Sequence, residues 1–234
     1  MIITISNVFG ETQKSLTCRG INIMHPIFGR IESMRIVPVI VISDAEKAVP
    51  LARALCDGGL PCAEVTFRTA QAADSIRAIT KALPDMLVGA GTVLTTAQVD
   101  EALDAGAKFM VAPGLNPETV RYCKSKGVPI LPGVITPSEI ESALSLGLDT
   151  LKFFPAEAAG GIKMLKSLSS PYGSVRFVPT GGITASNLAS YLELKNVLAC
   201  GGSWMVKDEL IKNGDFKKIT ELTREAVRLA ESAA

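Results

Sequence analysis

Short apolar runs alternate with amphipathic stretches along most of the chain. Eight runs are predicted as strands, each followed by a helix or helical stretch, at residues 35–42, 62–67, 86–93, 109–112, 130–134, 148–154, 176–179 and 197–200. Strands that are apolar on both faces are typical of parallel sheets covered by helices on both sides. The pattern therefore predicts an α/β fold, a (β/α)8 TIM barrel in a single domain. A doubly wound open sheet ranks lower as an alternative fold. Eight strand–helix units are more than that fold usually contains, and no GxGxxG motif follows the first strand.

Capping and turn residues delimit the helices expected between these strands. The helices are predicted at residues 43–56, 70–83, 96–105, 117–126, 137–147, 162–168, 185–194 and 216–230. Two segments, Ser43-Asp44-Ala45-Glu46 and Thr136-Pro137-Ser138-Glu139, have the spacing of a capping box. Residues 35–234 are predicted to form the barrel. Residues 1–34 show neither the helical nor the strand period of apolar residues, and we expect them to be an N-terminal extension. The scattered apolar residues over Ile21–Met34 suit a short packing helix.

Composition narrows the class of protein. The 234 residues are 47% hydrophobic and 20% charged, and 24 basic and 23 acidic residues leave a net charge of +1 without long runs of either sign. No nucleic-acid partner is therefore expected. The five cysteines are scattered, without a CxxC pair, as is typical of reduced core residues. No basic and apolar leader begins the chain, and no window approaches the about 18 apolar residues of a membrane span. We expect a cytoplasmic protein with no membrane partner.

Lys152 stands inside an apolar strand, between Leu151 and Phe153-Phe154. An ammonium group there loses hydration, so its pKa should fall and its neutral, nucleophilic fraction should rise. A neutral amine can attack a carbonyl carbon. The alternative is that Lys152 marks a strand end and that its head reaches water past the aromatic residues.

Glu64, Thr66 and Arg68 alternate with Val65 and Phe67 along the second predicted strand. If the second set faces the helices, the first set faces the barrel interior, where a carboxylate could act as a base near the lysine. The alternative is a buried Glu64–Arg68 ion pair with a structural role.

Glycine pairs follow the last two predicted strands. They lie in Pro179-Thr180-Gly181-Gly182-Ile183 and in Cys200-Gly201-Gly202-Ser203-Trp204. The carboxyl ends of the seventh and eighth strands are the usual phosphate site of a TIM barrel, where backbone N–H groups surround an anion. The two pairs together predict an anion site.

Six segments carry a resemblance to a known family. They are EVTFRT (Glu64–Thr69), VGAGTV (Val88–Val93), APGLNP (Ala112–Pro117), LKFFPAE (Leu151–Glu157), PTGGI (Pro179–Ile183) and GGSW (Gly201–Trp204). From about Arg35 to the C-terminus, the chain resembles the 2-keto-3-deoxy-6-phosphogluconate (KDPG) aldolases, also described as 4-hydroxy-2-oxoglutarate aldolases. Residues 1–34 have no counterpart in this resemblance.

The resemblance implies a class I aldolase that reversibly cleaves KDPG to pyruvate and glyceraldehyde 3-phosphate. Lys152 matches the Schiff-base lysine and Glu64 the general acid/base. The remaining matches are substrate-binding residues, with Arg68 and Thr92 at the pyruvate carboxylate, Pro113 and Phe154 in the pocket wall, and Gly181, Gly182, Gly202 and Ser203 at the phosphate. The resemblance also implies a homotrimer.

A protonated imine at C2 is a sufficient electron sink for C3–C4 cleavage, so neither a metal nor a cofactor is expected. A metal-dependent route would need a cluster of His and carboxylate ligands, and the only histidine, His25, lies outside the barrel repeats. A sister aldolase for 4-hydroxy-2-oxoglutarate or for the 6-phosphogalactonate epimer stays open. From another class, the rival is a catalytically silent barrel that binds a phosphorylated metabolite.

Overall fold

Parallel strands joined by helices make up the molecule, and the computed structural model describes residues 25–233. The strands are β1 Ile36–Ile40, β2 Cys62–Thr66, β3 Leu87–Gly91, β4 Met110–Val111, β5 Ile130–Leu131, β6 Gly133–Val134, β7 Thr150–Phe153, β8 Arg176–Pro179 and β9 Cys200–Gly202. The helices are α1 Pro26–Met34, α2 Ala48–Asp57, α3 Ala72–Ala82, α4 Thr96–Asp104, α5 Pro117–Ser125, α6 Pro137–Ser145, α7 Gly161–Ser169, α8 Leu188–Leu192, α9 Asp208–Asn213 and α10 Phe216–Ser232.

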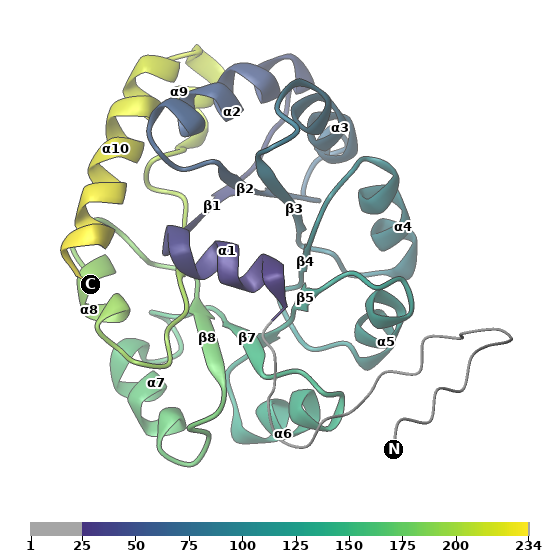
Figure 1. Ribbon diagram of the computed structural model, residues 1–234, viewed down its shortest axis with the longest axis vertical. Coiled ribbons are helices and arrows are strands. Elements are labelled where there is room, and N and C mark those ends of the chain that lie inside the picture. Colours follow the sequence, from purple (N-terminus) through teal and green to yellow (C-terminus); the bar gives the residue numbers. More distant parts are fainter. Residues whose placement is uncertain (1–24, 234) are drawn as a thin grey trace, which may run out of the picture.

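All strand pairs are parallel and fall into two sheets. One has the order β5-β4-β3-β2-β1-β9 and the other the order β6-β7-β8. Figure 1 shows the strands around the centre of the molecule, with helices α2 to α8 and α10 on the outside. The protein is therefore a mixed α/β fold with a curled parallel sheet, and the predicted alternation of strands and helices is confirmed.

Two strands differ from the prediction. The fifth is divided into β5 and β6 at Pro132, which has no N–H group to donate to a neighbouring strand. The last was expected at residues 197–200 but lies at Cys200–Gly202, where it pairs with β1 in the register Val37↔Gly201. Gly201 and Gly202 were predicted to follow this strand as part of an anion site, and in the structure their backbone continues the sheet.

Side chains pack on both sides of the strands. A large core fills the space between the sheet and the outer helices. A second, smaller cluster lies inside the curl, and it includes Phe28 and Ile31 of α1 together with Val37, Cys62 and Phe109. Helix α1 is the short packing helix expected within Ile21–Met34, and it lies across the centre of the strands (Figure 1). It therefore closes the amino-terminal end of the strands, opposite the predicted site.

Residues 1–23 precede the part of the chain that the structure describes, and we predict that they are dispensable. They lack the strand–helix pattern, so a protein beginning at Met24 should keep its activity and its unfolding temperature. A protein beginning at Arg35 is the informative comparison, because it also loses the buried side chains of Phe28 and Ile31. Losing two such side chains should cost roughly 3–6 kcal/mol of unfolding free energy. Equal instability of both truncated proteins in thermal unfolding would contradict the prediction.

The two predicted capping boxes have different outcomes. Thr136 and Glu139 form one at the start of α6, with the Glu139 carboxylate accepting hydrogen bonds from the amides of Ile135 and Thr136 at 2.7 and 2.8 Å. The first is wrong in detail. Asp44 itself accepts from the amide of Glu46, and a 3-10 turn at Ala45–Lys47 precedes α2. An aspartate reaches the amide two residues ahead, so it takes the capping role in place of Ser43.

Glu139 should make stability depend on pH. Burial raises its pKa, but the hydrogen bonds from Ile135, Thr136 and the Thr136 hydroxyl outweigh burial, and the net pKa lies below the ordinary value of 4.5. A lowered folded-state pKa gives stability that is present above pH 4.5 and is lost as the pH falls through the folded value. Wild type should therefore unfold at higher temperature than Glu139→Gln at pH 7, and the difference should vanish under acid. A difference independent of pH would contradict this origin.

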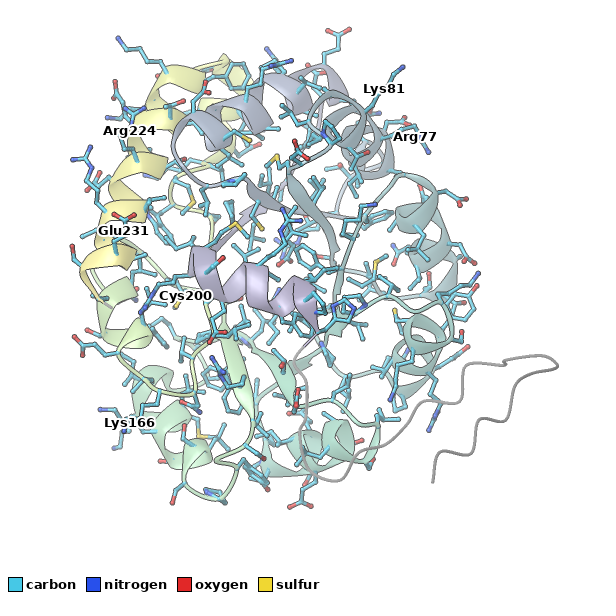
Figure 2. All side chains as sticks on the ribbon, in the orientation of Figure 1. Arg77, Lys81, Lys166, Cys200, Arg224 and Glu231 are labelled. Atoms are coloured by element: carbon cyan, nitrogen blue, oxygen red, sulfur yellow. The ribbon has the colours of Figure 1, made fainter. Side chains whose placement is uncertain are left out.

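Three of the cysteines are buried in the core, whereas the charged side chains labelled in Figure 2 lie on the outer helices. Cys62, Cys123 and Cys200 are buried, and burial raises the pKa of the Cys62 thiol to about 12 and that of Cys123 to about 11. Figure 2 shows Arg77, Lys81, Lys166, Arg224 and Glu231 pointing outward from the helices, whereas Cys200 lies inside. Cys18 lies outside the described residues. No helix in residues 25–233 is long and apolar enough to cross a bilayer.

Candidate active site

Lys152 is buried in the middle of the curled sheet. It lies on β7, between Gly133 of β6 and Val178 of β8 in register, and its side chain is only 6% exposed. The alternative of a strand-end lysine that reaches water is therefore wrong. The amide of Lys152 donates to the carbonyl of Pro132 at 2.9 Å, which fixes the backbone beneath the side chain.

The ammonium group of Lys152 has two partners. Its Nζ lies 3.3 Å from Oε1 of Glu64 on β2, a carboxylate that is 4% exposed. The ring centroid of Phe154 lies 5.1 Å from the same nitrogen. The sequence predicts that this group loses hydration, and in the structure a carboxylate and an aromatic face take the place of water around it.

Space for the Glu64 carboxylate comes from the neighbouring strand. A Cβ atom at Gly91 of β3 would lie 2.3 Å from Oε1 of Glu64, so any larger residue there would displace the carboxylate. The predicted alternation of β2 is confirmed, since Ala63 and Val65 pack in the outer core while Glu64 turns inward. Glycine at position 91 thus permits the carboxylate to reach the lysine.

Arg68 does not pair with Glu64. Within residues 25–233 the ion pair of Glu64 is with Lys152, and the Nε atom of Arg68 donates to the Thr92 hydroxyl at 3.3 Å. Thr92 has φ +57°, a left-handed conformation that is rare for a β-branched residue and costs on the order of 1–3 kcal/mol. Such strain is typical of functional sites. Arg68 and Thr92 therefore form a linked polar pair just above the strand ends.

Phe154 lies beside the lysine, and Pro113 lies against the neighbouring strand β6. Phe154 contacts the first glycine pair, because a Cβ atom at Gly181 would lie 3.4 Å from its Cδ2 atom. Pro113 follows β4, and its carbonyl oxygen would lie 2.1 Å from a Cβ atom at Gly133, the register partner of Lys152. The backbone of Pro113 thus lies against the strand beside the lysine.

A cavity of about 320 Å³ connects Arg68 and Phe154 with both glycine pairs. Its wall holds Val39, Val41, Arg68, Phe154, Thr180, Gly181, Gly182, Ile183, Gly201, Gly202 and Ser203. The wall does not include Lys152, Glu64, Thr92 or Pro113. Phe154 connects the buried pair with the cavity, because it lines the cavity and lies beside Lys152. All four predicted phosphate residues line one cavity.

Hydrogen bonds fix the direction of the Gly181–Gly182 backbone. The carbonyl oxygens of Thr180 and Gly181 accept from the amides of Ala156 and Glu157 at 2.8 and 3.0 Å. Gly181 and Gly182 have φ values of +100° and +81°, which only glycine adopts readily. A trans peptide points its N–H away from its C=O, so the Gly182 amide faces away from the segment that follows β7. Gly182 itself lines the cavity.

Sequence reasoning missed Val39 and Val41, which form part of the cavity wall. They alternate with the outer-core residues Ile40 and Ile42 on the first strand, and that period of two could have placed them inside. Among the described residues, no cluster of three or more His, Cys, Asp or Glu side chains has the arrangement of a metal site.

Known proteins share this sequence and this fold. A family model described as "KDPG and KHG aldolase" matches residues 27–222, beginning within α1. The 2-dehydro-3-deoxy-phosphogluconate aldolase of Treponema pallidum is 51% identical over 206 residues, which are 88% of this chain and 98% of that protein.

Two solved structures are similar over most of their length. The KDPG aldolase of Legionella pneumophila, with pyruvate captured as a covalent carbinolamine, is 42% identical with a TM-score of 0.83, over 86% of this chain and 97% of that one. The aldolase of Zymomonas mobilis with 3-phosphoglycerate is 42% identical with a TM-score of 0.80, over 85% and 94%. From this match in sequence and fold, the chain belongs to the KDPG and KHG aldolase family.

Proposed function

We propose that this protein is a class I aldolase that reversibly cleaves KDPG into pyruvate and glyceraldehyde 3-phosphate. The observation that carries the proposal is the buried pair of Lys152 and Glu64, with Nζ and Oε1 at 3.3 Å, beside a cavity that both glycine pairs line. The Legionella relative, which holds pyruvate as a covalent carbinolamine, supports a lysine-based mechanism.

In the proposed reaction, the Lys152 amine attacks the C2 carbonyl carbon of the substrate. The carbonyl oxygen leaves as water after protonation, which gives a protonated imine. Glu64 moves the protons in this step and then accepts the proton of the C4 hydroxyl. The C3–C4 electron pair passes to the imine nitrogen, so the aldehyde leaves and an enamine remains. Protonation at C3 and hydrolysis release pyruvate and the free lysine.

Arg68 and Thr92 are proposed to hold the pyruvate carboxylate. A planar guanidinium suits a carboxylate, and its link to the strained Thr92 holds it in place over the strand ends. Phe154 and Pro113 are proposed to form the apolar wall around the reacting carbons. Exclusion of water there strengthens the electrostatic interaction of Glu64 with the developing charges.

Gly181, Gly182, Gly202 and Ser203 are proposed to bind the phosphate. The support for this proposal is the cavity that these residues share, together with the hydrogen bonds that fix the Gly181–Gly182 backbone. The best test residue is Ser203, which is exposed. A Cβ atom at Gly202 would lie 1.9 Å from Cζ3 of Trp204, so any side chain at that position would disturb the fold.

Ser203→Asp should place a carboxylate at the phosphate end without filling a glycine position. Lost hydrogen bonds to a charged group and like-charge repulsion should lower kcat/KM for KDPG by about 100-fold or more. Ser203→Asn, which is neutral and of similar size, should lose much less. Imine formation with pyruvate, which has no phosphate, should be close to wild type in both. Equal losses with pyruvate and KDPG would contradict the phosphate assignment.

4-Hydroxy-2-oxoglutarate is a second candidate substrate, because the matching family model covers both KDPG and KHG aldolases. A panel of KDPG, its galactonate epimer, unphosphorylated 2-keto-3-deoxygluconate and 4-hydroxy-2-oxoglutarate tests the proposal. KDPG should have the highest kcat/KM. Higher efficiency with 4-hydroxy-2-oxoglutarate would make the smaller keto acid the natural substrate.

We also propose that the curled sheet closes into a (β/α)8 barrel over residues 35–234. Support comes from the isolated parallel bridges Phe177↔Val197 and Thr180↔Gly201, which join β8 to the last strand segment. The family resemblance supports a homotrimer and a cytoplasmic location.

A further inference from the structure

A buried tyrosine holds the segment on which the phosphate end rests. Tyr191 lies on α8, its side chain is fully buried, and its hydroxyl donates a hydrogen bond to the Glu157 carboxylate. Glu157 follows β7 and lies in the LKFFPAE motif, but the proposed mechanism gives it no role. Burial, together with the hydrogen bond to Glu157, raises the pKa of Tyr191 well above its ordinary value. The hydroxyl therefore stays protonated and remains a donor.

Glu157 passes this restraint to the glycine loop through its backbone and its Cβ. Its amide donates to the Gly181 carbonyl at 3.0 Å. A Cβ atom at Gly182 would lie 2.6 Å from the Glu157 Cβ, so the two segments are in close contact. A shift of the Glu157 backbone or Cβ would therefore move or release the Gly181–Gly182 backbone.

Gly161 gives the hydrogen bond its space. A Cβ atom there would lie 3.1 Å from Oε1 of Glu157 and 3.2 Å from the Tyr191 hydroxyl oxygen. With this bond in place, the carboxylate is directed to α8. Without it, a free negative charge would remain beside a site proposed to bind an anion, where like charges repel.

We propose that the Tyr191–Glu157 hydrogen bond positions the Gly181–Gly182 backbone for the phosphate of the substrate. Tyr191 and Glu157 are then positioning residues that set the preference for phosphorylated over unphosphorylated substrates. The proposal rests on the proposed function for the identity of the phosphorylated substrate.

Tyr191→Phe removes the hydroxyl and keeps the ring in its buried place. KM for KDPG should rise about 10- to 100-fold with little change in kcat, since small misplacements of a binding group have effects of this size. Imine formation with pyruvate should stay within about threefold of wild type. Tyr172→Phe is the matched control, because Tyr172 donates to Glu141 at 2.9 Å on the surface, away from the cavity. It should leave both readouts unchanged.

Variants of Glu157 separate positioning from general packing. Glu157→Gln keeps an oxygen acceptor for Tyr191, so it should keep most of the KDPG activity. Glu157→Ala should reproduce the KM of Tyr191→Phe. The double variant Tyr191→Phe/Glu157→Ala should be no worse than either single variant, as expected for two residues that act through one bond.

Two results would overturn the proposal. One is a folded Tyr191→Phe variant that loses KDPG cleavage and pyruvate imine formation equally. The other is a variant with unchanged KM for KDPG. Failure of the proposed function would look different, because wild type itself would then form the imine with pyruvate but not cleave KDPG.

Discussion

Replacing Lys152 with arginine should abolish aldol cleavage. The guanidinium stays protonated at any pH at which the protein is folded, so it cannot attack a carbonyl carbon. We expect kcat to fall by about 10⁶-fold, the loss typical of removing a covalent nucleophile. The measurement is KDPG cleavage followed through pyruvate release. Lys163→Arg, the same change at an exposed lysine on α7, is the matched control and should keep full activity.

Because Lys152 is buried, arginine could also disturb the packing around it. Lys152→Met is the control for packing, since methionine has nearly the same volume as lysine and no amine. Both variants should unfold cooperatively and both should be inactive. Substantial cleavage by either folded variant would show that another group attacks the substrate.

Replacing Glu64 with glutamine should slow the reaction by about 10²–10⁴-fold, the range typical for losing a positioned acid/base. The fold should survive, because the amide oxygen of glutamine still accepts a hydrogen bond from Lys152 and fits the space beside Gly91. The imine with pyruvate should still form, but more slowly. Presteady-state measurement of imine formation, together with kcat for KDPG, tests both expectations.

Glu118→Gln is the control for Glu64→Gln, because Glu118 is exposed in the first turn of α5. If Glu64→Gln kept near-normal activity, the pair with Lys152 would be a structural ion pair and another group would move the protons.

The sequence predicted the strands and helices well where local patterns determine them. Apolar runs located β1 to β4, and Thr136 with Glu139 marked the start of α6, because capping is decided within four residues. The predicted strand bounds were wrong where glycine, which has no side chain, forms part of a strand. Gly201 and Gly202 carry no apolar group that would signal a strand, and their place in β9 depends on pairing with Val37 and Pro38 of β1.

For the site, alternation along β2 predicted an inward Glu64, since side chains alternate strictly in a strand. The barrel prediction placed Glu64 near Lys152, but the direct ion pair could not be predicted from spacing, because the two residues are 88 positions apart and meet only across the curled sheet. The same holds for Arg68, which the sequence allowed to pair with Glu64 and which instead donates to Thr92. Contacts between strands depend on the closure and twist of the sheet.

Tyr191 was not predicted at all. Its segment was expected as a longer helix over residues 185–194, whereas α8 spans Leu188–Leu192. In sequence, a tyrosine among leucines has the pattern of an ordinary core residue. Only the structure shows that its hydroxyl reaches the Glu157 carboxylate, in a segment 34 residues earlier in the chain.

The central claim is that Lys152 is the lysine that forms an imine with pyruvate, and borohydride trapping tests it most directly. The wild-type protein is incubated with labelled pyruvate and borohydride, digested and mapped by mass spectrometry. The label should lie on the peptide that contains Leu151-Lys152-Phe153 and on no other lysine. Label on a different lysine, or no label in an enzyme that cleaves KDPG, would contradict the account.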